Sequence, residues 1–163
     1  MSEDNADEAA LRRFNSIGPF DPALFAQRMN MGGHGNFLGM RYRDHGDSWI
    51  ELALDWRADL VGDSDTCVIA SGAIISLLDN TTSLAVWTRT RQFRPQVTLD
   101  LRIDTIRDAV PGKTIIARAE CYRVRRAMAF VRGVAHDGDP ADPVASVVGI
   151  FMLIDGQWGE ETP

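Results

Sequence analysis

Hydrophobic periodicity divides most of the chain into one long helix and a series of strands. Between Val68 and Trp87 the sequence VIASGAIISLLDNTTSLAVW repeats apolar residues at helical spacing. This spacing predicts one long, mostly buried helix that begins near Ser71 and Gly72. Ser48–Arg57 instead alternates apolar and polar residues, as expected of a strand with one buried face.

Four more strands are predicted after the long helix. Residues 97–103 and 115–121 alternate in the same manner and predict two half-buried strands. Met128–His136 is a third candidate, and Val144–Ile154 is apolar on both parities, as in a central strand covered on both faces. Short turns separate these strands, which favours an antiparallel meander.

Before the long helix, the sequence predicts a short helix and a further strand. Asp21 fits a helix N-cap and Pro22 the first helical position, so a helix is expected from Pro22 to about Met29. The glycine-rich segment Met31–Asn36 is expected to end it, and Phe37–Tyr42 to form a short strand. Two strands, one long helix and four strands make one α+β unit, in which an antiparallel sheet of about six strands wraps the helix.

Length and charge limit the domain count and the partners. A chain of 163 residues suits one domain, which we expect over residues 21–156, between an acidic N-terminal tail of residues 1–20 and a C-terminal tail of residues 157–163. The net charge of −6 provides no basic field to attract nucleic acid or an anionic membrane. Neither partner is expected.

The cysteines and the N-terminus favour a cytoplasmic protein with no metal and no cofactor. Cys67 and Cys121 have neither metal-ligand spacing nor a CxxC pattern, so a reducing compartment is the default. The first residues lack the basic-then-apolar order of a signal peptide. The long apolar run carries polar residues at its middle, so a membrane span is not expected.

Asp79 is the only ionisable residue between Val68 and Trp87. Aspartate is a poor helix former, and burial of its charge is unfavourable unless partners are supplied. Two interpretations stay open. The carboxylate caps a loop amide or pairs with an arginine, or it is kept for chemistry.

The order of elements, with an aspartate two turns into the central helix, resembles the hotdog-fold thioesterases, specifically the phenylacetate-type (PaaI-like) acyl-CoA thioesterases. The segment Ala70-Ser71-Gly72 lies where the family has His-Gly-Gly, and Leu77–Asn80 matches its helix motif. Val97–Leu101 matches the following strand, and Ile106–Gly112 is similar to a turn of the form Arg-Pro-x-x-Gly. The resemblance covers about Phe37–Ile154 and implies the hotdog fold.

The resemblance also implies roles for individual residues. Asp79 would be the general base or nucleophile, Thr98 would position water, and the amides of Ser71 and Gly72 would polarise the thioester carbonyl. Two family positions differ, because the histidine is Ala70 and the asparagine falls on Ser64. The loss of the histidine need not abolish activity, because helix N-terminal amides stabilise an oxyanion without a particular side chain.

The spacing of Ser71 and Asp79 predicts a homodimer. Eight positions on one helix separate them by roughly 12 Å, so one thioester carbonyl cannot contact both. Two antiparallel central helices would bring Asp79 of one chain near Ser71 of the other. A dimer of dimers stays open.

Acyl-CoA is the substrate that the resemblance implies. Two arginine clusters could meet the coenzyme A phosphates. They comprise Arg89, Arg91 and Arg94 after the helix, and Arg123, Arg125 and Arg126 before the next-to-last strand. Solvated surface charge is the alternative interpretation of both clusters. For the acyl pocket and its surroundings we select Ile75, Asn80 and Thr82, and for the phosphates Arg123 and Arg126.

Other functions stay open as alternatives. A hotdog protein that binds acyl-CoA without hydrolysing it would fit the replacements at Ala70 and Ser64. A hydratase or dehydratase would require a histidine at the substrate, and His34, His45 and His136 are expected at a helix exit, a turn and a strand end.

Overall fold

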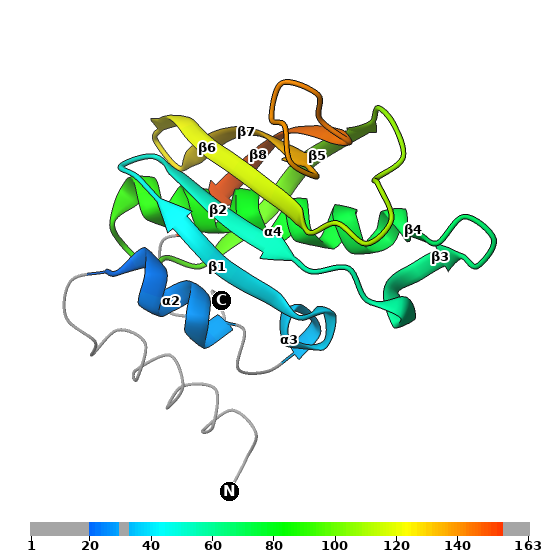
Figure 1. The fold of residues 1–163 in the computed structure, drawn as a ribbon. Coiled ribbons are helices and arrows are strands. Elements are labelled where there is room, and N and C mark those ends of the chain that lie inside the picture. Colours follow the sequence, from blue (N-terminus) through cyan, green and yellow to red (C-terminus); the bar gives the residue numbers. More distant parts are fainter. Residues whose placement is uncertain (1–19, 30–32, 155–163) are drawn as a thin grey trace, which may run out of the picture.

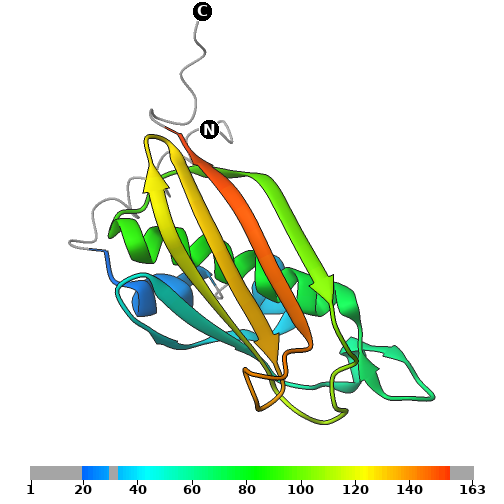
Figure 2. The same ribbon diagram turned by 90° about the horizontal axis from the view of Figure 1, so that it is seen from above.

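A six-stranded antiparallel sheet curves over one long helix (Figures 1 and 2). The computed structural model describes residues 20–29 and 33–154, with the backbone alone for Arg28 and Met29. The expected tails, residues 1–20 and 157–163, lie outside the described residues except for Phe20.

The elements follow the predicted order. The helices are α2 (Pro22–Met29), α3 (Gly33–Leu38) and α4 (Ser71–Thr90). The sheet contains β1 (Met40–His45), β2 (Trp49–Leu54), β5 (Gln96–Thr105), β6 (Ile115–Arg125), β7 (Met128–His136) and β8 (Ala145–Leu153), in the spatial order β1-β2-β6-β7-β8-β5. A 3₁₀ turn, Ala58–Leu60, and a two-stranded ribbon, β3 (Val61–Asp63) with β4 (Val68–Ile69), lead into α4. The predicted α+β hotdog architecture is confirmed.

The buried side of α4 is rich in threonine for a core helix, and its own backbone satisfies the hydroxyls. Thr81 and Thr88 are fully buried, and each donates a hydrogen bond to the carbonyl one turn back, at 2.6 and 2.9 Å. Burial of a hydroxyl without a partner would be unfavourable, and this back-bonding removes that penalty. The helix ends at Arg91, which takes the left-handed conformation, with φ 53°.

One stripe of α4 is left uncovered by the sheet. At 3.6 residues per turn its members lie within roughly 140° of the helix circumference. They are exposed or half-buried and comprise Gly72, Ile75, Ser76, Asp79, Asn80 and Ser83. Most are small or polar, unlike the leucines and valines that face the sheet. The candidate active site lies on this stripe.

The N-terminal prediction needs correction in part. The helix predicted from Pro22 to about Met29 is confirmed, and residues 31 and 32 lie outside the described residues. Residues 33–38, expected as a helix exit and the start of a strand, form α3 instead, and the strand starts at Met40. Leu38 is buried, so packing of α3 outweighs the poor helix propensity of its two glycines. Gly39 ends α3 with φ +76°, and a Cβ there would lie 2.7 Å from the Arg57 guanidinium.

Two strands are less covered than expected. The register between β5 and β8 shifts between Thr98 and Asp100, a bulge that leaves Leu99 49% exposed. On β8, Val148 and Met152 are exposed, so the strand is covered on one face within this chain and not on both. The half-buried pattern of β6 is confirmed, with its alternate residues fully buried.

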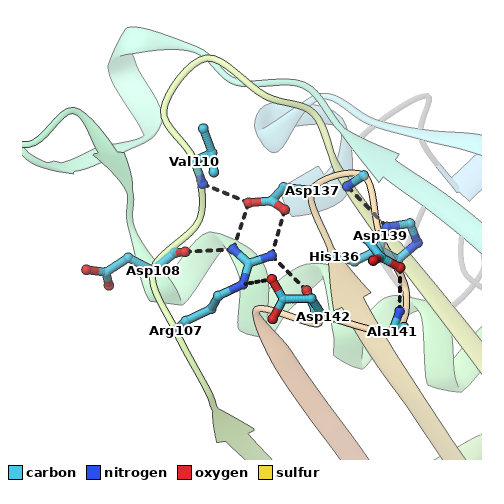
Figure 3. A network of polar contacts seen from close by, with 9 residues as sticks. Arg107, Asp108, Val110, His136, Asp137, Asp139, Ala141 and Asp142 are labelled. Atoms are coloured by element: carbon cyan, nitrogen blue, oxygen red, sulfur yellow. Dashed lines mark hydrogen bonds and ion pairs between the residues drawn. The ribbon is translucent and has the colours of Figure 1, made fainter.

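A carboxylate–guanidinium pair ties together the two loops at one end of the sheet (Figure 3). Arg107 donates two hydrogen bonds to Asp137, at 2.9 and 2.8 Å, and the Val110 amide donates a third to the same carboxylate. Arg107 also donates to the carbonyls of Asp108 and Asp142. The Arg107 bonds hold the pKa of Asp137 well below its usual range.

We predict that Asp137→Asn lowers the melting temperature by roughly 3–10 °C, because Arg107 and the Val110 amide lose charge-assisted hydrogen bonds. A carboxyl whose pKa is lower in the folded state stabilises the folded protein at pH values above its unfolded-state pKa. This stabilisation is lost in strong acid. The difference in melting temperature between the variant and the wild type, measured by calorimetry, should therefore be largest at neutral pH and decrease below about pH 4. Asp104→Asn, at an exposed pair, is the control and should change the melting temperature little.

Candidate active site at the start of the long helix

Two free backbone amides stand at the N-terminus of α4. The N-cap residue, Ala70, has no side chain that could cap the helix, and its carbonyl accepts the Ala73 amide at 3.0 Å. Among the described residues, nothing accepts a hydrogen bond from the amides of Ser71 or Gly72, and both residues are exposed. Free amides and the positive end of a helix dipole together favour negative charge.

A close backbone approach fixes the entry of the chain into α4. The Ala70 amide donates to the Leu60 carbonyl at 2.8 Å. A Cβ added to Gly62 would lie 3.0 Å from the Ala70 Cα, so a larger residue there would require a small shift of the ribbon or of the N-cap residue. The ribbon thereby positions the first turn of α4.

Gly72 faces open space. A Cβ added at this position would meet no atom within 4 Å, and its φ is not in the left-handed region. Nothing within the described chain therefore requires glycine there. The space beside the Gly72 amide is available to a ligand or to a second copy of the chain.

Asp79 is half-buried on the uncovered stripe, and no described residue donates a hydrogen bond to its carboxylate. Burial raises its pKa above the ordinary value for aspartate. The structural interpretation required a capped amide or an arginine partner, and the described residues supply neither. A carboxylate with a raised pKa and no partner is suited to accept a proton.

The chain returns along α4 after the end of the helix. The Trp87 indole donates to the Arg94 carbonyl at 2.7 Å, and the side-chain amide of Gln96 donates to the Ser83 hydroxyl at 2.6 Å. Thr98 follows Gln96 by two residues on β5 and is exposed, and no described hydrogen bond joins it to Asp79.

The other selected residues lie in different surroundings. Ile75 is 44% exposed on the stripe, and Asn80 donates to the Ser76 carbonyl. Thr82 is buried, and its hydroxyl bonds to the carbonyls of Leu78 and Asp79. Ser64 is exposed at the tip of the β3–β4 ribbon.

Arg123 and Arg126 lie at the other end of the molecule from the start of α4. Both are exposed near the β6–β7 hairpin, where Arg126 has φ 55°. Figure 1 shows this hairpin beside the C-terminal end of α4. Arg89, in the last turn of α4, is close enough to Cys121 on β6 to interact with its thiol electrostatically.

His34 is a residue of this region that sequence reasoning did not select. Its Nε2 lies 3.2 Å from the Ser76 hydroxyl, so α3 places an imidazole against the uncovered stripe of α4. The two residues are 42 positions apart. No pattern in the sequence links them, because α3 itself was not predicted.

The described residues contain neither a membrane-spanning helix nor a metal-binding cluster. No helix among them is both long enough and apolar enough to span a bilayer. No group of three or more His, Cys, Asp or Glu side chains in residues 20–29 and 33–154 is placed to hold a metal ion.

Comparisons with known proteins point in one direction. A model of the thioesterase superfamily matches residues 68–144. A Pseudomonas aeruginosa protein of known structure is 33% identical over 82% of this chain and 100% of its own, with a TM-score of 0.75. No match was found among curated proteins.

Two further solved structures carry the same fold. A mutant of the phenylacetic acid degradation protein PaaI from Thermus thermophilus is 25% identical, over 74% of this chain and 97% of its own, with a TM-score of 0.63. The PaaI protein of the E. coli phenylacetic acid degradation operon is 16% identical, over 83% and 95%, with a TM-score of 0.70, and shows the fold alone.

We predict that Asp79→Asn raises the melting temperature by a few degrees at neutral pH, because it removes a half-buried charge without a partner. A carboxyl whose pKa is raised by folding destabilises the folded state when it is ionised. The destabilisation is complete at pH values above the raised pKa. The difference in melting temperature between variant and wild type should therefore disappear as the pH falls toward the unfolded-state pKa, near about 4. A gap that is independent of pH in thermal scans would contradict the prediction, and Asp100→Asn, at an exposed position, is the matched control.

Proposed function

We propose that this chain, which belongs to the thioesterase superfamily, hydrolyses acyl-CoA thioesters to a free acid and coenzyme A. Asp79 would act as the general base or nucleophile, and the amides of Ser71 and Gly72 as oxyanion donors. The observation that carries the proposal is the combination, on one uncovered helix stripe, of free N-terminal amides and a half-buried carboxylate that has no partner among the described residues.

The chemistry needs few groups. With Asp79 as the base, water loses a proton to the carboxylate and attacks the thioester carbonyl, whose oxygen takes the negative charge. The Ser71 and Gly72 amides stabilise that oxygen. The intermediate then expels the coenzyme A thiolate and leaves the free acid. Thr98 would orient the water, as the family resemblance implies. With Asp79 as nucleophile, an anhydride forms first and water hydrolyses it.

The site is composite in this proposal. Asp79 and Ser71 of one chain are roughly 12 Å apart along α4, so two antiparallel copies of the helix would form each site. The uncovered stripe with exposed Ile75 supports a second copy at this face. So does β5, an edge strand of the described sheet, with Leu99 exposed.

Coenzyme A phosphates would be bound at the basic end of the helix. Eleven residues separate Asp79 from Thr90, the last residue of α4, which is roughly 16 Å along the axis. An extended pantetheine arm is of this order of length. Arg123 and Arg126 near the β6–β7 hairpin would then meet the phosphates, with Arg89 beside them.

Binding without turnover is the second candidate function. Ala70 and Ser64 supply no acid or base at the start of α4, since one is a methyl group and the other lies at the ribbon tip. The same free amides would still bind an acyl-CoA carbonyl. This candidate requires that acyl-CoA raises the melting temperature while no thiol is released.

We predict that Asp79→Asn lowers kcat by about a hundredfold or more, because the amide cannot accept a proton. The assay is thiol release from short, medium, long and aromatic acyl-CoAs, with Asp100→Asn as the control of equal chemistry at an exposed strand position. If Asp79→Asn turns over acyl-CoA as the wild type does, Asp79 has no part in the mechanism. If even the wild type releases no thiol, the binding protein is favoured.

We further predict that two inactive variants complement each other. Gly72→Val should fold, because nothing lies within 4 Å of the added Cβ, but its side chain would block the space beside the amide. After subunit exchange of a 1:1 mixture with Asp79→Asn, half of the dimers are mixed and each has one intact composite site. Turnover should therefore recover to about a quarter of that of the wild type. No recovery would place both groups of a site on one chain.

A further inference from the structure

An imidazole stands beside the start of α4 in a defined hydrogen-bonding arrangement. His34 Nε2 is 3.2 Å from the Ser76 hydroxyl, which in turn donates to the Gly72 carbonyl at 2.9 Å. The ring also stacks nearly parallel on Phe37, with an interplanar angle of 19°. His34 is exposed, so the rest of the ring is open to a ligand.

The Ser76 hydroxyl determines which ring nitrogen is free. A serine hydroxyl has one hydrogen, and that hydrogen goes to the Gly72 carbonyl. The oxygen can then only accept from His34, so Nε2 carries the proton of the neutral ring. Nδ1 is left with its lone pair and no partner among the described residues.

We propose that His34 is a substrate-binding residue, whose Nδ1 accepts a hydrogen bond from the amide N–H that follows the thioester in the pantetheine arm. This inference rests on the proposed function, since it takes the ligand to be an acyl thioester of coenzyme A. It adds a specificity for the thiol half of the substrate that the oxyanion amides cannot provide.

The distances along the helix agree with this assignment. The Ser76 hydroxyl lies at the level of Gly72, because it bonds to the carbonyl there. A thioester carbonyl held by the Ser71 and Gly72 amides, with its sulfur directed toward α3, would place that sulfur near the imidazole. The amide nitrogen is three single bonds from that sulfur, roughly 4 Å when extended. The two groups of one substrate can thus meet the amides and His34 of one chain together.

The test compares two substrates that differ in one atom. One is the thioester of N-acetylcysteamine, which keeps the amide N–H, and the other is the thioester of 2-acetoxyethanethiol, in which oxygen replaces it. Both substrates carry the same acyl group, and this acyl group contains no hydroxyl. His34→Ala should raise KM about three- to tenfold for the first substrate only, with kcat little changed. His34→Asn, whose side-chain oxygen lies near the position of Nδ1, should restore most of the affinity, and His34→Gln should not.

Controls separate this inference from the function on which it rests. His45→Ala removes a histidine that bonds to Tyr42 and should leave both KM values unchanged. Equal losses for both substrates in His34→Ala, or no loss for either, would overturn the inference. If the wild type hydrolyses neither these thioesters nor acyl-CoA, the proposed function fails, and dissociation constants of the corresponding non-hydrolysable thioethers then decide the role of His34 by the same comparison.

Discussion

A single curved sheet can cover only one side of a helix, and the rest of this molecule follows from that limit. The sheet buries the leucines, Val86 and three of the four threonines of α4 and leaves a stripe from Gly72 to Ser83 uncovered. The residues of the stripe are mostly small or polar, so it could not serve as a second core face. It gathers the free amides, the carboxylate of Asp79 and the imidazole contact at Ser76 on one surface.

Within α4, polar groups divide into those that the helix satisfies by itself and those that it does not. Thr81 and Thr88 return their hydroxyl hydrogens to carbonyls one turn back, so they are compatible with full burial. Asp79 cannot do this, since a carboxylate only accepts and all helical amides beyond the first turn are already bonded. Burial without a compensating hydrogen bond raises the pKa of Asp79, whereas the buried threonine hydroxyls are uncharged and hydrogen-bonded.

Periodicity was sufficient to predict the long helix and the strands, because each depends on residues close in sequence, whereas the hotdog architecture was implied by the resemblance to the thioesterase family. It could not predict α3, where burial of Leu38 outweighs two glycines, or the bulge that exposes Leu99. In the site, Asp79 was identifiable as an isolated charge in an apolar run. His34 was not, because its contact with Ser76 crosses 42 residues and depends on the unpredicted helix.

The approach of Gly62 to Ala70 couples the position of the β3–β4 ribbon to that of the first amides of α4. The contact joins backbone to backbone, so there is no flexible side chain to absorb an added methyl group. Any residue larger than glycine at position 62 would push the N-cap residue and tilt the two amides that follow it.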